Sequence, residues 1–177
     1  MPNYRRVFHP GGSYFFTHTL LERSGNDLLI RRIDALRDAV RQTRLILPFT
    51  IDAWVVLPDH FHCVLTLPSE DDDFPRRWRL IKTSFSKSIP EEQGRSSKRR
   101  RKGERALWQR RYWEHLIRDE RDLSAHVDYV HINPVKHRLA RTVADWPYST
   151  FHRCVEQDIY PRDWAGSAGA EELDYVE

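Results

Sequence analysis

The sequence predicts an α+β fold, in which an antiparallel sheet of the order β-α-β-β-α-β has two helices on one face and an additional C-terminal helix follows. Two kinds of pattern lead to this prediction. Short runs of apolar and aromatic residues, separated by Gly, Pro or Asp turns, are typical of antiparallel strands. Longer segments repeat apolar residues every three or four positions, as amphipathic helices do.

The N-terminal part of the chain contributes a strand and a helix. Residues 13–20 follow a Pro-Gly-Gly turn at 10–12 and alternate aromatic with β-branched side chains, which predicts a central strand. Apolar residues then recur at helical spacing from 26 to 47, and Pro48 stands just past them as a stop signal. We therefore expect one long amphipathic helix over 26–47.

The middle of the chain adds a strand pair and a second helix. Residues 50–57 and 60–67 are rich in Val, Leu and Trp and flank a Pro-Asp turn at 58–59, which predicts two paired antiparallel strands. Between 74 and 89 the apolar residues fall at offsets of three and four, so they share one helix face and leave the arginines on another. Residues 90–105 combine turn formers with dense positive charge, which indicates a loop.

The last strand and helix complete the order of elements. Residues 112–117 alternate again and predict the fourth strand. Asp119 can then cap a helix that runs to about Asn133, where Pro134 is compatible with its end. The order is that of a ferredoxin-like split β-α-β arrangement, and the extra C-terminal helix carries Tyr129.

Size and composition are those of one folded domain. Of the 177 residues 40% are hydrophobic and 31% charged, so we expect a single domain over 1–165 and a flexible tail over 166–177. No apolar run reaches the length of a membrane span and the first residues lack a signal-peptide segment, so we expect a cytoplasmic protein with no membrane partner. Cys63 and Cys154 form no CxxC pair, which argues against a structural zinc ribbon.

Positive charge is concentrated in two places and indicates a polyanionic partner. The net charge is only +3, but seven of the eleven residues from 95 to 105 are Lys or Arg, and a second basic group lies within 74–89. Solvation of the surface is the alternative explanation for such a run. On DNA, these side chains should mostly contact phosphates. The residues expected at DNA are Arg5, Arg6, Arg76, Arg77, Arg79, Lys82, Arg99, Arg100 and Arg101.

A histidine pair on the third predicted strand is the first candidate for chemistry. His60 and His62 are two residues apart, so on a strand their side chains point to the same face, about 6 to 7 Å apart along the backbone. Both can then reach one metal ion. Taken alone, such a pair is more often a surface feature or a satisfied polar pair, so a metal site needs a third ligand.

The predicted C-terminal helix offers that ligand. Tyr129 and Asn133 are four residues apart, so on a helix they lie on one face. Two neutral imidazoles and an amide oxygen leave positions for water and phosphate oxygens, a set that suits Mg²⁺ or Mn²⁺ better than a closed zinc site. A tyrosine has a reference pKa of about 10 and needs activation to attack phosphorus. Without further context, a tyrosine packed on the sheet is the simpler interpretation.

Further motifs give the sequence a specific resemblance. His60-Phe61-His62 follows Trp-Val-Val-Leu-Pro at 54–58 and looks like the HUH motif of single-tyrosine transposases. Five other segments resemble REP-associated tyrosine transposases in order and spacing, so that the match extends to about Gly166. They are YRR at 4–6, PGG with YFFT at 10–17, WQRRYWEH at 108–115, HVDYVHINPVK at 126–136 and DWPYSTFH at 145–152.

The resemblance implies a metal-dependent endonuclease and strand transferase that binds single-stranded hairpin DNA of the REP type and cuts beside the hairpin. It implies Tyr129 as the nucleophile of a 5′-phosphotyrosine intermediate, and His60, His62 and Asn133 as ligands of Mg²⁺ or Mn²⁺. Many HUH relatives carry Gln at the third-ligand position, where Asn133 has a shorter side chain. His126, three residues before Tyr129, is a candidate for positioning it. We expect a monomer or a weak homodimer.

Two other functions fit parts of the pattern. The same β-α-β-β-α-β order serves noncatalytic nucleic-acid-binding modules, in which exposed aromatic residues of the sheet stack on bases. Such a module needs neither a co-facial histidine pair nor a Tyr-x-x-x-Asn helix. A metal nuclease that activates water is the other alternative, and it would cleave DNA without Tyr129.

Overall fold

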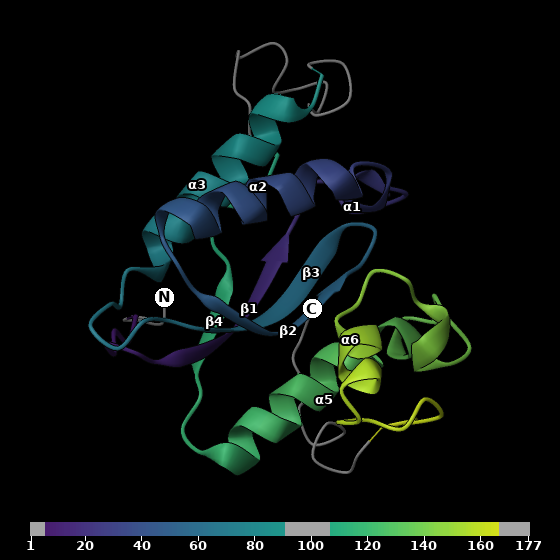
Figure 1. Ribbon diagram of the computed structural model, residues 1–177. Helices are drawn as coiled ribbons and strands as arrows, with labels where there is room; N and C mark the ends of the chain where they lie inside the picture. The colour runs from purple at the N-terminus through teal and green to yellow at the C-terminus, as the bar shows by residue number, and fades with distance from the viewer. Residues whose placement is uncertain (1–5, 91–106, 167–177) are drawn as a thin grey trace, which may run out of the picture.

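The computed structural model describes residues 6–90 and 107–166 of the chain, which form a layered α+β unit (Figure 1). The elements found are β1 (Ser13–Thr19), α1 (Leu28–Arg31), α2 (Ile33–Ile46), β2 (Thr50–Val56), β3 (His60–Thr66), α3 (Phe74–Ser88), β4 (Trp113–Leu116), α5 (Glu120–Lys136), the 3₁₀ helix η1 (Val143–Asp145) and α6 (Phe151–Glu156).

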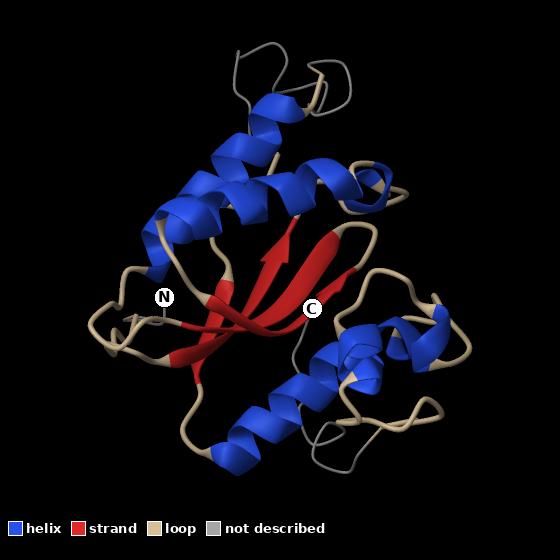
Figure 2. Cartoon of the chain, in the orientation of Figure 1, coloured by secondary structure: helices blue, strands red, loops and turns tan. Residues whose placement is uncertain are grey.

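The strands pair antiparallel in the order β2-β3-β1-β4. This is the strand order of the ferredoxin-like arrangement, in which the first and third strands are central and the other two form the edges. Helices α2 and α3 cover one face of the sheet and α5 crosses the other (Figures 1 and 2). The predicted fold class, with two helices on one face and an extra C-terminal helix, is confirmed.

Alternation along β1 sends successive side chains into two separate cores. Phe16 packs against Trp78 in the core that the sheet forms with α2 and α3. Phe15 points the other way and packs with Tyr129 in the core beneath α5. Cys63 lies buried in the first core, so it faces away from the α5 side, as its place directly after His62 on the strand predicts.

The expectation of one continuous helix over 26–47 is wrong at Arg32. This residue has φ −118° and ψ 31°, outside the helical region, and it separates α1 from α2. The break allows Leu28 and Leu29 to enter the core, and it brings the Leu29 amide within 3.2 Å of the Pro58 carbonyl, to which it donates. Burial of two leucines therefore outweighs the helical continuity that local periodicity suggests.

Helix α5 begins where the sequence predicts and ends later. The Asp119 side chain accepts a hydrogen bond from the Asp122 amide at 2.8 Å and caps the helix. The expected end near Asn133 is wrong, because α5 continues through Pro134 to Lys136. Proline has a helix-compatible φ and removes only one hydrogen-bond donor, so a packed helix tolerates it near its end. The extra turn brings Lys136 beside the face that carries Tyr129.

Two expected segments cannot be compared with the structure. The basic loop over 90–105 and the tail over 166–177 lie outside the described residues, apart from their first residues. In the described part of the chain, none of the helices combines the length and the apolar character needed to cross a lipid bilayer.

Candidate active site

The histidine pair lies at the start of β3, on the face of the sheet that α5 covers. The rings of His60 and His62 have centroids 5.0 Å apart and meet edge to face. Both residues are buried, with 3% and 0% exposure. The co-facial geometry that the His-x-His spacing predicts is confirmed.

Hydrogen bonds hold one nitrogen of each ring. His60 Nδ1 lies 2.7 Å from Asp59 Oδ1, and His62 Nδ1 lies 2.8 Å from Thr17 Oγ1. Asp59 also accepts from Arg23 Nε at 2.6 Å. Burial raises the pKa of Asp59, but the hydrogen bonds from His60 and Arg23 outweigh burial and bring this pKa to about 2. The carboxylate therefore stays charged and orients the His60 ring, as partners of metal-binding histidines do.

Helix α5 brings Tyr129 to this histidine pair and carries Asn133 one turn further along. The Tyr129 ring lies 5.5 Å from the His62 ring and 5.8 Å from the Phe15 ring, in edge-on contact with both. Tyr129 and Asn133 are almost completely buried. Residues four apart on a helix share a face. The structure therefore brings together the Tyr129 side chain and the β3 histidines, which are far apart in the sequence.

The Asn133 side chain is the polar group of this region that suits a ligand best. Its Oδ1 and Nδ2 are both buried, and neither has a hydrogen-bond partner among the described residues. Leaving a buried amide unsatisfied costs free energy, so such groups usually carry a function or bind something else. An amide oxygen is a ligand for hard divalent cations. The donor set of two imidazoles and one amide oxygen therefore fits a divalent metal.

Two cationic or titratable side chains near the site were not assigned a role from the sequence. Lys136 Nζ lies 4.5 Å from the centroid of the Tyr129 ring. The His137 ring lies 5.1 Å from the His60 ring. The signal for Lys136 was present, because seven residues make about two helical turns and return to the face of Tyr129. A helix that ends near Asn133 would not include Lys136, whereas α5 continues to it.

A second histidine cluster ties β4 to the first turns of α5. His115 Nε2 lies 2.9 Å from Asp122 Oδ2, and His126 Nδ1 lies 3.0 Å from Asp122 Oδ1. The His115 and His126 rings stack with centroids 4.6 Å apart. Within the residues that the structure describes, this is the group of His and acidic ligands close enough to hold one metal ion. The three side chains already satisfy one another, which suits a structural tether.

Phe15 lies between this cluster and Tyr129, the candidate nucleophile, and contacts both. The His126 ring contacts the Phe15 ring at 5.0 Å, and Phe15 in turn contacts Tyr129. Burial lowers the pKa of His126, an effect that exceeds the opposing influence of its hydrogen bonds to Asp122. A neutral His126 ring packed on Phe15 agrees with the positioning role expected from its spacing to Tyr129. Glu114, one residue before His115, turns to the other sheet face and pairs with Arg6 Nε at 3.2 Å.

The expected DNA contact at Arg77 is wrong. Arg77 is 1% exposed, and its guanidinium donates to Asp71 Oδ1 and Oδ2 at 2.9 and 2.8 Å and to the Pro48 carbonyl at 2.7 Å. The arginine therefore anchors α3 to the preceding loops. Arg76 and Arg79 occupy the exposed side of α3 and remain able to meet phosphates.

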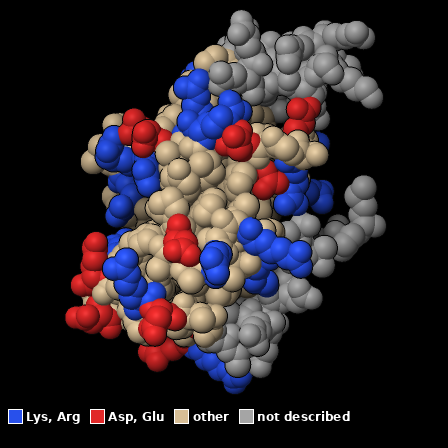
Figure 3. Space-filling view, turned by 90° about the vertical axis from the view of Figure 1, so that its right-hand side faces the viewer, with Lys and Arg blue, Asp and Glu red and all other residues tan. Residues whose placement is uncertain are grey.

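Lys82 holds a less accessible position than the sequence suggests, whereas Arg6 is exposed. Lys82 Nζ lies 5.4 Å from the Trp108 ring centroid and 5.3 Å from that of Tyr112, and Arg6 lies over the Tyr112 ring at 4.5 Å. Burial, with the nearby charge of Arg6, lowers the pKa of Lys82 to about 8. The other expected contacts, Arg5, Arg99, Arg100 and Arg101, lie outside the described residues. On the face shown in Figure 3, basic and acidic groups border a largely uncharged area.

Known proteins resemble the chain over nearly its whole length, although no family model matches it. A REP-associated tyrosine transposase of Escherichia coli strain K12 is 46% identical over 166 residues, which are 94% of this chain and 92% of that protein. A Haemophilus influenzae protein with the same family name is 47% identical over 168 residues, 94% of this chain and 95% of its own length.

A solved structure agrees with these relatives. It is a REP-associated tyrosine transposase bound to a REP hairpin, with 46% identity and a TM-score of 0.82, and the match covers 94% of this chain and 93% of that one. The matched span contains the sheet, the histidine pair of β3 and the Tyr129 helix. Identity at this level over more than nine tenths of both chains is specific to a family, and the chain belongs to the REP-associated tyrosine transposases.

Proposed function

We propose that this chain cleaves and joins single-stranded DNA beside palindromic hairpins of the REP type, with Tyr129 as the nucleophile. The observation that carries the proposal is the contact of the Tyr129 ring with the His62 ring, which unites a helix and a strand distant in sequence. The solved relative bound to a REP hairpin supports the choice of substrate. A noncatalytic nucleic-acid-binding module does not require this arrangement of buried polar residues.

His60, His62 and Asn133 are the residues that would hold a divalent cation, with Mg²⁺ and Mn²⁺ as the proposed ions. Asp59 and Thr17 fix the Nδ1 side of the two rings, which is how protein groups orient metal-binding imidazoles. The buried amide of Asn133, without a partner in the described residues, would gain one. When bound, such an ion polarises a phosphate oxygen and neutralises developing charge.

The proposed chemistry is the exchange of one phosphodiester for another. The Tyr129 oxygen bonds to phosphorus while the bond from phosphorus to the 3′ oxygen breaks, leaving a 3′-hydroxyl and a 5′-phosphotyrosine. The phenol proton is lost to solvent as the departing 3′ oxygen gains one, and Lys136 places a positive charge over the ring of the attacking tyrosine. Rejoining reverses the step, when a 3′-hydroxyl attacks the phosphotyrosine and releases Tyr129.

The burial of Tyr129 restricts access of DNA to its hydroxyl group. The Tyr129 side chain is 1% exposed, so a phosphate cannot reach its hydroxyl without some change around it. DNA binding therefore has to expose the phenol, by a change of its rotamer or by movement of the groups that cover it.

Arg76 and Arg79, on the exposed side of α3, can add phosphate contacts that are independent of base sequence.

A covalent-adduct assay tests this proposal. A hairpin with single-stranded flanks and a 3′ label should give a labelled protein band on denaturing gels in Mg²⁺ or Mn²⁺, and chelation should abolish it. Tyr129→Phe should bind the hairpin but form no adduct, whereas Tyr112→Phe, altered on the opposite sheet face, should react normally. An undiminished adduct in Tyr129→Phe would sink the assignment. Cleavage without any adduct would favour a water nucleophile.

A further inference from the structure

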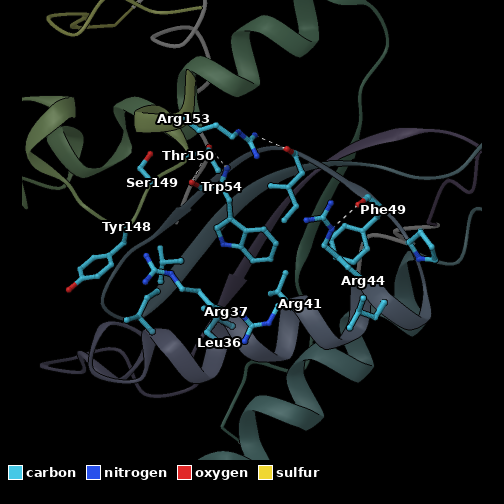
Figure 4. A pocket seen from close by; sticks show the side chains of 16 residues that line it. Leu36, Arg37, Arg41, Arg44, Phe49, Trp54, Tyr148, Ser149, Thr150 and Arg153 are labelled. Carbon is cyan, nitrogen blue, oxygen red and sulfur yellow. Dashed lines mark hydrogen bonds between the residues drawn. The ribbon is translucent and has the colours of Figure 1, made fainter. Parts of the chain in front are cut away.

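A pocket beside β2, at the outer edge of the sheet, has no role in the chemistry described above. It has a volume of about 590 Å³ and lies between α2, β2 and the segment that leads into α6. Figure 4 shows the Trp54 indole across its floor, with arginines of α2 on one side and the Tyr148–Arg153 segment on the other. We call it the β2-edge pocket.

The walls of the β2-edge pocket are basic. Arg37, Arg41 and Arg44 follow one another at offsets of four and three on α2, so they share a face, and Arg153 stands across from them on α6. No Asp or Glu is among the described residues that line the pocket. From Arg37 to Arg44 the helix rises about 10 Å, which is more than one phosphate group requires.

The four arginines differ in how firmly they are held. Arg44 Nε donates to the Phe49 carbonyl at 3.1 Å, and Arg153 donates to the Ile51 carbonyl at 2.9 Å. Arg37 and Arg41 pair with Asp34 and Asp38, exposed acids of their own helix, and the two arginine side chains are 58% and 67% exposed. Exposed pairs of this kind contribute little, so both guanidinium groups can turn toward an anion in the pocket.

The floor of the pocket contains a buried donor that lacks an acceptor. Trp54 is 7% exposed, and its Nε1 is buried without a hydrogen-bond partner among the described residues. A buried indole N–H normally finds an acceptor, because leaving it unmade costs free energy. Tyr148 adds a second aromatic ring to the lining. The pocket therefore combines aromatic surface, an unused donor and several cations.

We infer that the β2-edge pocket binds unpaired nucleotides of the DNA that flanks the hairpin, with a base against Trp54 and phosphates along the arginines of α2. Aromatic stacking combined with a basic groove is how proteins hold single strands. A base supplies ring nitrogens or carbonyl oxygens that can accept from Trp54 Nε1. The length of the arginine row favours a continuing strand over a free mononucleotide.

The position of the pocket relates it to the proposed active site. Trp54 and Val55 are consecutive in β2 and face opposite sides of the sheet, and Val55 pairs with His62 of β3. A strand held at Trp54 therefore lies at the edge that also leads to the histidine face. This inference rests on the proposed function, because it assigns part of the same substrate to a second surface.

Binding measurements with two DNAs test the inference. One hairpin keeps its single-stranded flanks and the other ends at the base of its stem. The double variant Arg37→Gln/Arg41→Gln should bind the flanked hairpin about ten-fold more weakly and the bare hairpin within two-fold of wild type. The slope of log K against log salt should fall by about 1.4 for the flanked DNA alone. Trp54→Phe, which keeps a ring but removes the donor, should lose about five-fold.

The control carries the same change of charge elsewhere. Arg31→Gln/Arg121→Gln alters two exposed arginines that do not line the pocket, and it should bind both DNAs alike. An equal loss for the flanked and the bare hairpin would overturn the inference, because the arginines would then act on the stem or on the overall field. No loss at all would overturn it as well.

Photocrosslinking separates this inference from the proposed chemistry. Hairpins with 5-iodouracil at successive flank positions should crosslink to peptides that contain Trp54 or Tyr148. Crosslinks confined to other peptides would refute the pocket assignment, even if the Tyr129 adduct forms. Crosslinks at Trp54 in a protein that forms no Tyr129 adduct would support DNA binding in the β2-edge pocket and refute the assignment of Tyr129 as the nucleophile.

Discussion

Replacing Asn133 by leucine should stabilise the metal-free protein and abolish its response to metal. The Asn133 side chain is fully buried, and its two polar atoms have no hydrogen-bond partner among the described residues. Each unsatisfied group of this kind costs about 1–3 kcal/mol, and an apolar side chain of similar size removes that cost. Some of the gain is lost because leucine packs with a different shape, so we expect a net increase of about 1–2 kcal/mol in the free energy of unfolding.

Thermal unfolding with and without divalent metal measures this effect. For a chain of this length, 1 kcal/mol corresponds to about 2–4 °C in Tm, so Asn133→Leu should melt a few degrees higher than wild type in chelator. Wild type should gain about 2.7 kcal/mol when the metal concentration is 100 times Kd, and the variant should gain far less. Covalent adduct formation should be lost in the variant.

Asn133→Asp is the matched control. It keeps an oxygen ligand and adds a charge that is costly when buried without a partner. It should therefore melt lower than wild type in chelator and recover in metal. The reasoning is refuted if Asn133→Leu is strongly destabilised in chelator, since the amide would then make hydrogen bonds that hold the fold. It is also refuted if metal stabilises this variant as much as wild type.

Three further changes give distinct expected outcomes. Arg77→Gln should lower the free energy of unfolding by about 2–3 kcal/mol in urea titrations, because it removes charge-assisted hydrogen bonds of a buried guanidinium to the partly exposed Asp71 and to the Pro48 carbonyl. Arg76→Gln on the exposed face should change it little. Burial lowers the pKa of His131 from 6.5 to about 4, so the unfolded state binds a proton before the folded state does as the pH falls. Acidification from pH 6.5 to 4 should therefore lower the free energy of unfolding by up to about 3 kcal/mol. His131→Gln should reduce this loss, as measured by urea titrations at both pH values. Thr17→Val removes the group that holds His62 Nδ1, and calorimetric titration should show metal affinity lowered by about 10- to 100-fold with the fold retained. Unaltered affinity in Thr17→Val would show that Thr17 does not orient the ring.

Local patterns predicted most of the architecture. Alternation of side chains placed His60 and His62 on one face and Cys63 on the other, because strand geometry repeats every two residues. Spacing of four put Tyr129 and Asn133 on one helix face for the same kind of reason. These relations depend only on the geometry of one element, so they can be read without knowledge of its neighbours.

Burial and charge could be predicted less well. Arg77 and Arg79 lie in one basic run, yet Arg77 is enclosed by loop carbonyl and carboxylate groups while Arg79 is exposed. Composition cannot distinguish them, because the difference arises from Asp71 and Pro48, which the fold brings to the helix. The break at Arg32 has a similar origin, since core burial of the preceding leucines overrides local helical preference.

The amino-acid sequence by itself determined the order of the elements, the faces on which the histidines and the tyrosine lie, and the family to which the chain is similar. Only the tertiary structure decided that Tyr129 meets His62 on one face of the sheet, that Lys136 lies over the Tyr129 ring, and that Trp54 lines a basic pocket. Periodicity describes directions within one strand or helix. Distances between elements depend on packing of the whole chain, and it is these distances that bring the histidines and the tyrosine into one candidate site.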